Sequence, residues 1–369
     1  MLLRYGRPEE VNMDGYRLRL ACDKLRALVD SGMIPGFVLL VVRKSVIVIH
    51  EAYGYSSLVP DKRPMRRDTI FDIASMTKPI ATATALMKLV ESGEVYLRQK
   101  VSEIIPEFRG NHKEEVTIWH LLTHTSGLPA WRPLYRLGSR DKIISAICTM
   151  PLEYRPGERV VYSCLGYILL GEIIERVSGA SLDDYVKKNI FVPLGMKDTM
   201  FNPPEELHSR IAATEHCRWR KRLIIGEVHD ENAYAMGGVS GNAGLFSTAY
   251  DLAIFAQMIL NMGRYDDVRV LSPLTVELMI RNHTSELNEA RGLGWIINDG
   301  KSVTSCGDLL SIGSFGHTGF TGTSIWIDPK VDLAIILLTN AVHPSREKRY
   351  HIIKARPVVH NIIASSILV

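Results

Sequence analysis

Residues 71–80 read Phe71-Asp72-Ile73-Ala74-Ser75-Met76-Thr77-Lys78-Pro79-Ile80, and they lead into a run of small and apolar residues at 81–90. The pattern predicts a short extended segment followed by a buried helix that ends near Gly93, because a proline in the first helical turn needs no N–H partner. Ser75 and Lys78 lie three positions apart, so their side chains are expected to meet on one helix face. Burial disfavours an ammonium, which predicts a neutral, basic Lys78 able to activate Ser75.

The same spacing occurs a second time, at Ser345-Arg346-Glu347-Lys348. This second match lies in a polar stretch that is typical of the solvated start of a C-terminal helix. A serine and a lysine at this spacing are therefore not a sufficient sign of catalysis. The apolar helix predicted around Ser75 is what distinguishes the first match from the second.

The composition is that of an ordinary globular protein. The chain has 369 residues, of which 46% are hydrophobic and 23% are charged, and its net charge is +4. A chain of this length can bury a large core, in one unit or in two lobes. The sequence shows no concentrated basic face, so nucleic acid is not an expected partner.

The cysteines and the N-terminus indicate a reducing compartment. The cysteine number is odd, and an odd, scattered set without a Cys-x-x-Cys pair predicts reduced thiols, neither a disulfide framework nor a zinc site. The first ten residues lack the apolar core of a signal peptide, and no stretch reaches the roughly 18 apolar residues of a membrane span. We therefore expect a cytoplasmic protein without a membrane span, unless a leader was removed before residue 1. The five cysteines are Cys22, Cys148, Cys164, Cys217 and Cys306.

The order of the periodic segments predicts an α/β (α+β) fold. Helices are expected at 14–31, 141–150, 166–177, 181–191 and 248–260, and strands at 37–42, 46–50, 324–327 and 333–338. Ser181-Leu182-Asp183-Asp184 predicts a capping box at the start of the fourth helix. Such an order is most simply built as one antiparallel sheet flanked by N- and C-terminal helices, with an all-helical lobe inserted between the strands.

This organisation also predicts the lobes and the position of the site. Residues 1–72 and 245–369 are expected to form the α/β sheet lobe, and residues 73–244 a mainly helical lobe. The active site is expected in the cleft between them, because ligand sites commonly lie at the junction of two such units.

Three histidines lie in patterns that suggest other chemistry. His120 and His124 stand four residues apart, which suits a metal, but Leu121 occupies the position where a metalloprotease motif requires glutamate. His229 is followed by Asp230 and is interpreted as a structural hydrogen-bonding group, with substrate orientation or ion binding as the alternative.

Two further stretches complete the set of chemically interesting residues. Tyr162 follows the turn at Pro156-Gly157 and precedes a predicted helix, where a tyrosine is commonly a packed aromatic with a solvated hydroxyl. The segment Ser314-Phe315-Gly316-His317-Thr318-Gly319-Phe320-Thr321-Gly322-Thr323 leads into a predicted strand. Glycines beside a strand often allow another backbone or a ligand to approach closely, although a bulged edge strand is the simpler interpretation.

Together these stretches resemble the three motifs of the serine β-lactamase and penicillin-binding protein superfamily, and most closely its class C-like branch. The first motif is Ser75-Met76-Thr77-Lys78, the second is Tyr162-Ser163-Cys164, and the third is His317-Thr318-Gly319. Phrases at 121–128, 191–196 and 238–248 also resemble this branch, which includes DD-peptidases and carboxylesterases. The resemblance runs from about Gly36 to about Asn340.

The resemblance implies a covalent mechanism. Ser75 would attack an acyl carbon and form an acyl-enzyme that water then hydrolyses, and Lys78 and Tyr162 would share the role of general base. A nearby ammonium would lower the pKa of the Tyr162 phenol. The backbone N–H groups of Ser75 and Phe320 would form the oxyanion hole.

Two positions depart from the pattern of the family. Cys164 stands where many members have an asparagine whose amide holds a substrate amide, and a thiol is a much weaker hydrogen-bonding partner. His317 replaces a lysine, so a titrating imidazole replaces the fixed positive charge that would meet a penicillin carboxylate. Both changes argue against efficient β-lactam hydrolysis.

We therefore expect a serine hydrolase of the β-lactamase-related type, acting on a small ester or peptide as a carboxylesterase or a DD-carboxypeptidase does. The predicted catalytic residues are Ser75, Lys78 and Tyr162, and the predicted substrate-binding and oxyanion residues are Cys164, His317, Thr318, Gly319 and Phe320. No cofactor or metal is expected, and the sequence gives no prediction of oligomeric state. The alternatives are a weak β-lactamase or penicillin-binding protein, a non-catalytic module that binds peptidoglycan fragments, and a metal hydrolase using His120, His124 or His229.

Overall fold

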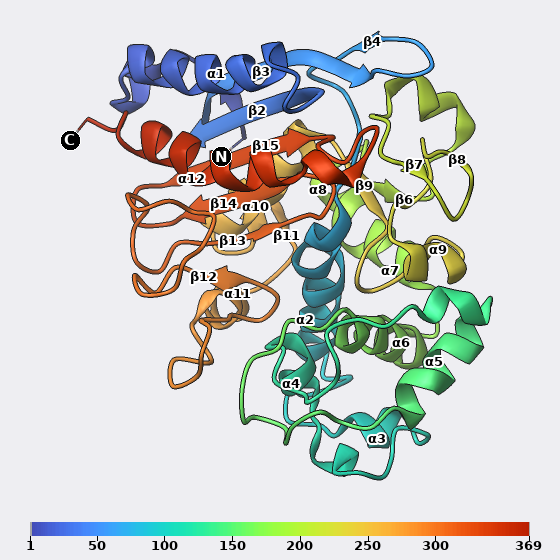
Figure 1. Ribbon diagram of the computed structural model, residues 1–369. Helices are drawn as coiled ribbons and strands as arrows, with labels where there is room; N and C mark the ends of the chain where they lie inside the picture. The colour runs from blue at the N-terminus through green and yellow to red at the C-terminus, as the bar shows by residue number, and fades with distance from the viewer. Residues whose placement is uncertain (1, 369) are drawn as a thin grey trace.

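The central sheet is assembled from both ends of the chain (Figure 1). In the computed structural model, which describes residues 2–368, the strand order is β1–β3–β2–β15–β14–β13–β12. The short strand β4 pairs with β3 beside this order. Neighbouring strands are antiparallel except β1, which pairs with β3 in parallel. The strands are β1 Arg4–Tyr5, β2 Gly36–Arg43, β3 Val46–Ser57, β4 Arg63–Pro64, β12 Ile296–Ile297, β13 Phe315–Thr318, β14 Ser324–Asp328 and β15 Leu333–Thr339.

Strand β2 is buried on both faces, and its alternating side chains enter two different cores. Val38, Leu40 and Val42 belong to a core that also contains helix α10 (Ala249–Leu260). Phe37, Leu39 and Val41 face the terminal helices, α1 (Gly15–Asp30) and α12 (Tyr350–Ala364). A fully apolar strand with period-two alternation is expected at the centre of a sheet covered on both faces.

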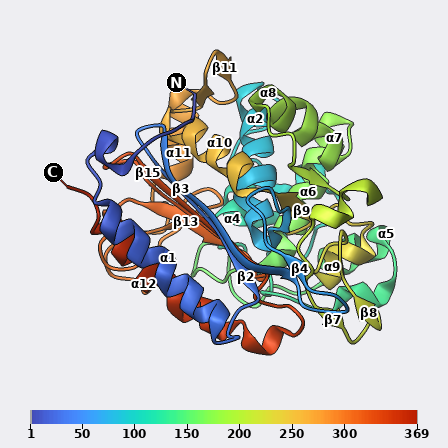
Figure 2. The ribbon, with the colours of Figure 1, turned by 90° about the horizontal axis from the view of Figure 1, so that it is seen from above.

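The two terminal helices lie side by side on one face of the sheet (Figure 2). Helix α1 begins where the Asp14 side chain accepts hydrogen bonds from the N–H groups of Tyr16 and Arg17. Such a cap satisfies backbone donors that have no partner inside the helix. The predicted fold class is thus confirmed, with a mixed α/β architecture and a central, mainly antiparallel sheet.

The middle of the chain contributes mostly helices, which extend away from the sheet (Figure 1). The π-helical segment Lys78–Ala83 continues into α2, and α6 packs against both. The remaining helices are α2 Thr84–Glu91, α3 Val101–Ile104, α4 Ile118–Leu122, α5 Arg140–Thr149, α6 Cys164–Ser178, α7 Leu182–Val186, α8 Val192–Leu194, α9 Glu231–Ala235 and α11 Pro273–Ile280.

Short strands interrupt this helical part of the chain. β5 (Phe71–Asp72), β9 (Leu245–Ser247) and β6 (Met200–Phe201) form a small antiparallel sheet in the order β5–β9–β6. Two hairpins also occur, β7 with β8 and β10 with β11. Their strands are β7 His216–Cys217, β8 Arg222–Leu223, β10 Arg264–Tyr265 and β11 Val268–Arg269.

Two local predictions were wrong. The helix expected to carry Ser75 and Lys78 in one first turn is divided, with Ser75 on the 3₁₀ turn Ala74–Met76 and Lys78 at the start of the π-helical segment. Ser181 precedes α7, but its side chain accepts no capping hydrogen bond. Periodicity identifies a buried helix, but it does not specify whether the first turns have 3₁₀, α or π hydrogen bonding.

None of the helices within residues 2–368 is long and apolar enough to cross a membrane.

Removing side-chain volume from β2 should reveal how much stability the two cores supply. Leu39→Ala and Leu40→Ala each leave a cavity at a residue with no exposed surface, so each is expected to lower the free energy of unfolding by about 2–5 kcal/mol. Leu274→Ala, at a side chain that is 77% exposed, should change it by less than about 0.5 kcal/mol. Guanidinium denaturation measures all three, and equal effects at Leu39 and Leu274 would contradict the assignment of β2 to the core.

Candidate active site

Ser75 follows a backbone turn that is held in an unusual conformation. Ala74 has a φ of 47°, a left-handed value that costs energy for a residue with a Cβ atom. The Asp72 carboxylate stabilises this turn, since its Oδ1 atom accepts a hydrogen bond of 2.8 Å from the Ala74 N–H. The turn follows strand β5, and the half-buried Ser75 side chain points toward Lys78.

Lys78 connects the serine to two other segments of the chain. Its Nζ atom lies 3.0 Å from Ser75 Oγ, 2.8 Å from the carbonyl oxygen of Asn242 and 3.7 Å from Cys164 Sγ. The residue has no exposed surface. The expectation that Ser75 and Lys78 meet is therefore met by the geometry.

The protonation of Lys78 differs from the prediction. Burial lowers the pKa of Lys78, but its interactions with the side chains of Cys164 and Tyr162 raise the pKa by more, so the pKa lies above its ordinary value. The sequence-based expectation of a neutral amine is therefore wrong, because it considered burial and not the acidic neighbours. At neutral pH, Lys78 is an ammonium that donates to Ser75 and Asn242.

Tyr162 lies on the loop before α6 and faces the same ammonium. Lys78 Nζ is 4.9 Å from the centroid of the Tyr162 ring. Burial raises the pKa of Tyr162 more than Lys78 lowers it, so the pKa lies above its ordinary value and the side chain is a phenol at neutral pH. The Lys78 ammonium does lower the pKa of Tyr162, as predicted. The net pKa nevertheless lies above the ordinary value, so the prediction of a more acidic phenol was wrong.

His317 is an uncharged residue packed beside Tyr162. The two ring centroids lie 5.9 Å apart, and the His317 side chain is only 2% exposed. Burial, Lys78 and Arg291 together hold its pKa well below 6.5. Because Nδ1 lies 2.9 Å from the Thr318 carbonyl oxygen, Nδ1 carries the proton and donates it. The titrating imidazole expected from the sequence is thus neutral near neutral pH.

The turn after β13 is clamped onto the segment that carries Ser75. The hydroxyl of Thr321 donates to the Asp72 carbonyl oxygen at 2.6 Å, and that of Thr323 donates to the Ile73 carbonyl oxygen at 3.2 Å. Within residues 2–368, neither the Ser75 N–H nor the Phe320 N–H donates a hydrogen bond to the protein. Gly319 allows the two backbones to approach, since a Cβ atom there would collide with the Ile73 carbonyl oxygen.

Cys164 is the first residue of α6 and is held at the site by its backbone. Its N–H donates to the Ala130 carbonyl oxygen at 2.9 Å. Burial raises the pKa of the Cys164 thiol more than the neighbouring Lys78 lowers it. The side chain is therefore a neutral thiol beside an ammonium.

The sequence analysis missed four residues of this site. Asn242 supplies the carbonyl acceptor for Lys78, and Asp72 supports the turn before Ser75. His124 packs against Tyr162 with ring centroids 4.6 Å apart, and the Arg291 guanidinium lies 5.4 Å from the same ring. Asn242 and His124 carried a signal, because they lie in the 238–248 and 121–128 phrases that resemble the family.

The histidines considered as metal ligands serve other purposes. His120 Nδ1 accepts a hydrogen bond from the Thr117 N–H at 3.0 Å, and His124 Nδ1 accepts one from the Ser163 N–H at 3.0 Å. His229 Nε2 lies 2.9 Å from Glu215 Oε2. Among residues 2–368 there is no cluster of three or more histidine, cysteine, aspartate or glutamate side chains arranged to hold a metal ion.

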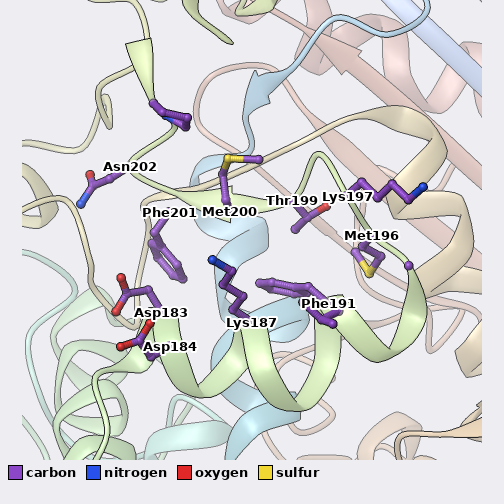
Figure 3. A pocket seen from close by; sticks show the side chains of 13 residues that line it. Asp183, Asp184, Lys187, Phe191, Met196, Lys197, Thr199, Met200, Phe201 and Asn202 are labelled. Carbon is purple, nitrogen blue, oxygen red and sulfur yellow. The ribbon is translucent and has the colours of Figure 1, made fainter. Parts of the chain in front are cut away.

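A separate cavity of about 510 Å³ lies between α7, α8 and the strand β6 (Figure 3). Phe191, Met196 and Phe201 form its apolar wall, and the side chain of Lys187 extends between the two phenylalanines. None of the predicted site residues lines this cavity.

The fold, together with the relatives that share it, defines a serine hydrolase. The chain belongs to the beta-lactamase family, whose model matches residues 23–359, and the resemblance inferred from the three motifs is confirmed. A relative from Salmonella agona (strain SL483), named "Putative D-alanyl-D-alanine carboxypeptidase", is 36% identical over 93% of this chain and 87% of its own length.

Two solved structures share the fold. One is "EstCE1, a hydrolase with promiscuous acyltransferase activity", with a TM-score of 0.73 and 24% identity over 93% of this chain and 99% of the other. The second is the unliganded simvastatin synthase LovD of Aspergillus terreus, with a TM-score of 0.75 and 23% identity over 95% of this chain and 98% of the other.

The contact between Gly319 and Ile73 can be tested by adding one methyl group. Gly319→Ala should lower the free energy of unfolding by about 1–3 kcal/mol, because its Cβ atom would overlap backbone and side-chain atoms that are held in place. Gly166→Ala is the matched control, since its Cβ atom would meet its nearest neighbour, Leu121, at 3.5 Å inside a helix. Denaturant unfolding of both variants checks the prediction, and a Gly319→Ala protein as stable as the wild type would contradict the close approach.

Proposed function

We propose that the protein hydrolyses an ester or amide through an acyl-enzyme on Ser75. The observation that carries the proposal is the 3.0 Å contact between Lys78 Nζ and Ser75 Oγ in a setting where the lysine is fully buried. A serine is a weak nucleophile unless a positioned group accepts its proton. In this site that group is the coupled pair of Lys78 and Tyr162.

The resting pair holds one proton too many for catalysis. Lys78 as an ammonium and Tyr162 as a phenol offer no base, so the pair must lose one proton before it can accept that of Ser75. Ser75 Oγ then attacks the acyl carbon, and its proton passes to the pair. Collapse of the tetrahedral intermediate breaks the bond to the leaving group, which takes that proton. Water repeats the sequence on the acyl-enzyme and releases the acid.

The negative charge that develops on the acyl oxygen requires donors that are already in place. The N–H groups of Ser75 and Phe320 are the candidates, because neither donates to an acceptor in the described residues 2–368 and their segments are tied together through Thr321 and Thr323. Preorganised donors of this kind typically contribute about 10²–10³-fold each to kcat.

The substrate we propose is a small ester or a peptide with a D-amino acid, reached from the cleft between residues 73–244 and the sheet lobe. The carboxypeptidase name of the Salmonella relative supports the peptide, and EstCE1, described as a hydrolase with promiscuous acyltransferase activity, supports chemistry on acyl groups more generally. A β-lactam is a weaker candidate, because His317 is uncharged and Cys164 stands in place of an amide donor.

A covalent label distinguishes this enzyme from a non-catalytic binding module. The protein is incubated with a fluorophosphonate and with p-nitrophenyl butyrate, a D-alanyl-D-alanine peptide and a chromogenic cephalosporin, and intact mass and peptide mapping follow. We expect one adduct, on Ser75, and loss of turnover and adduct in Ser75→Ala. Ser345→Ala, in the second Ser-x-x-Lys segment, should behave as the wild type. An unlabelled Ser75 with retained binding of peptidoglycan fragments would identify a binding module instead.

The pH dependence follows from the raised pKa values of the pair. Since both groups hold their protons at neutral pH, the competent fraction grows tenfold per pH unit, and log kcat/KM should rise with a slope near 1 between about pH 6 and 8. Tyr162→Phe should lower kcat/KM by about 100-fold or more. His317→Ala should alter the profile only below pH 6.5, because the pKa of His317 lies well below that value. A flat profile in the wild type would contradict the assigned base.

A further inference from the structure

The Phe320 side chain lies outside the hydrophobic core and contacts the His229 imidazole and the Arg349 guanidinium. Its ring stacks on the imidazole of His229, with centroids 5.6 Å apart and an interplanar angle of 22°. On the same ring the guanidinium of Arg349 lies 4.1 Å from the centroid. Phe320 is 37% exposed, so these contacts have to replace the packing that would hold a buried residue. His229 therefore contacts Phe320 through its side chain, in addition to the hydrogen bonds of Thr321 and Thr323 that hold the turn.

His229 is held in turn by a buried carboxylate. His229 Nε2 lies 2.9 Å from Glu215 Oε2, and the Arg346 guanidinium donates to the same oxygen at 2.7 Å through Nε. Burial raises the pKa of Glu215, but the hydrogen bonds from His229 and Arg346 outweigh burial and lower the pKa to about 2. Glu215 is consequently a carboxylate at any pH at which the enzyme works.

The backbone of His229 contacts the turn that precedes Ser75, whose N–H is the other donor of the proposed oxyanion hole. Its N–H donates to Asp72 Oδ2 at 2.6 Å, while Asp72 Oδ1 accepts the N–H of Ala74, the residue before Ser75. His229 thus contacts Asp72, which holds the turn before Ser75, through its main-chain N–H. It contacts the side chain of Phe320 through its imidazole ring. These contacts join segments that are far apart in the sequence.

We propose that His229, Glu215 and Arg346 are positioning residues that align the N–H groups of Ser75 and Phe320 on the acyl oxygen in the transition state. The proposal rests on the proposed acyl-enzyme function and adds the source of its alignment. It also gives a role to the second Ser-x-x-Lys segment, which supplies Arg346 to the network. Because a displacement of about 1 Å can cost roughly 10²-fold in rate, loosening His229 should reduce kcat without removing the hole.

The experiment compares an ester with its thiono analogue. A thiocarbonyl sulfur accepts hydrogen bonds poorly, so an aligned oxyanion hole accelerates p-nitrophenyl butyrate far more than the thionoester, and misalignment reduces that difference. The variants are His229→Gln, which keeps a donor for Glu215 but loses the ring, and Arg346→Met, which removes the guanidinium from Glu215. Lys348→Met is the matched control, because Lys348 donates to the Gly32 carbonyl oxygen and lies outside the network.

In both network variants we expect kcat for the ester to fall about 10- to 100-fold, KM to stay within about threefold, and the ester-to-thionoester rate ratio to fall at least about fivefold. Lys348→Met should leave all three unchanged. Thermal melting monitors folding, and the Arg346 side chain, at 41% exposure, offers a variant that leaves the core intact. A loss of kcat with an unchanged rate ratio would overturn the proposal and assign a purely structural role.

The controls separate this inference from the proposed function. If the wild type is labelled on Ser75 and turns over the ester while the network variants keep their kcat and rate ratio, only the positioning role falls. If the wild type shows neither label nor turnover, the acyl-enzyme mechanism fails and the positioning role falls with it.

Discussion

The burial of one ammonium group organises the candidate active site. A buried cation costs several kcal/mol unless partners replace its hydration. No carboxylate forms an ion pair with Lys78 in the part of the chain that the structure describes. Its partners are the Asn242 carbonyl oxygen and the Ser75 hydroxyl, together with the rings of Tyr162 and Tyr167 at 4.9 and 5.7 Å from Nζ. A neutral cage of this kind stabilises the charge without fixing it as a carboxylate would, which the proposed proton transfer between lysine, phenol and serine requires.

The position of the cage explains several features of the fold. Asn242 reaches Lys78 because Gly241 lies against Gly171 of α6 with no side chain between the backbones, and because Thr82 donates to the Gly241 carbonyl oxygen at 2.7 Å. The two glycines are thus required by a close approach of two segments. The first turns of the Lys78 helix, α6 and the 238–248 segment are in consequence fixed relative to one another before any substrate is present.

The sequence was sufficient for the parts of the structure that local pattern determines. β2, β14 and β15 follow from short apolar runs, and α1 follows from its helical period. The Ser75–Lys78 contact was predicted because three residues separate the partners. The contacts of Asp72 with His229, and of Arg291 with Tyr162, join residues more than a hundred positions apart, and no local pattern records them. The pKa directions of Lys78 and Tyr162 failed for the same reason, since they depend on a sum over all neighbours.

The replacement of the lysine of the third motif by His317 does not leave Tyr162 without a fixed positive charge. His317 is neutral, but Arg291 lies 5.4 Å from the centroid of the Tyr162 ring and is only 4% exposed. Glu289 accepts hydrogen bonds from Arg291 Nε and from one terminal nitrogen, which leaves the other terminal nitrogen buried without a partner among the described residues. A guanidinium paired with Glu289 therefore lies next to the phenol, while the place of the motif lysine is occupied by an uncharged ring.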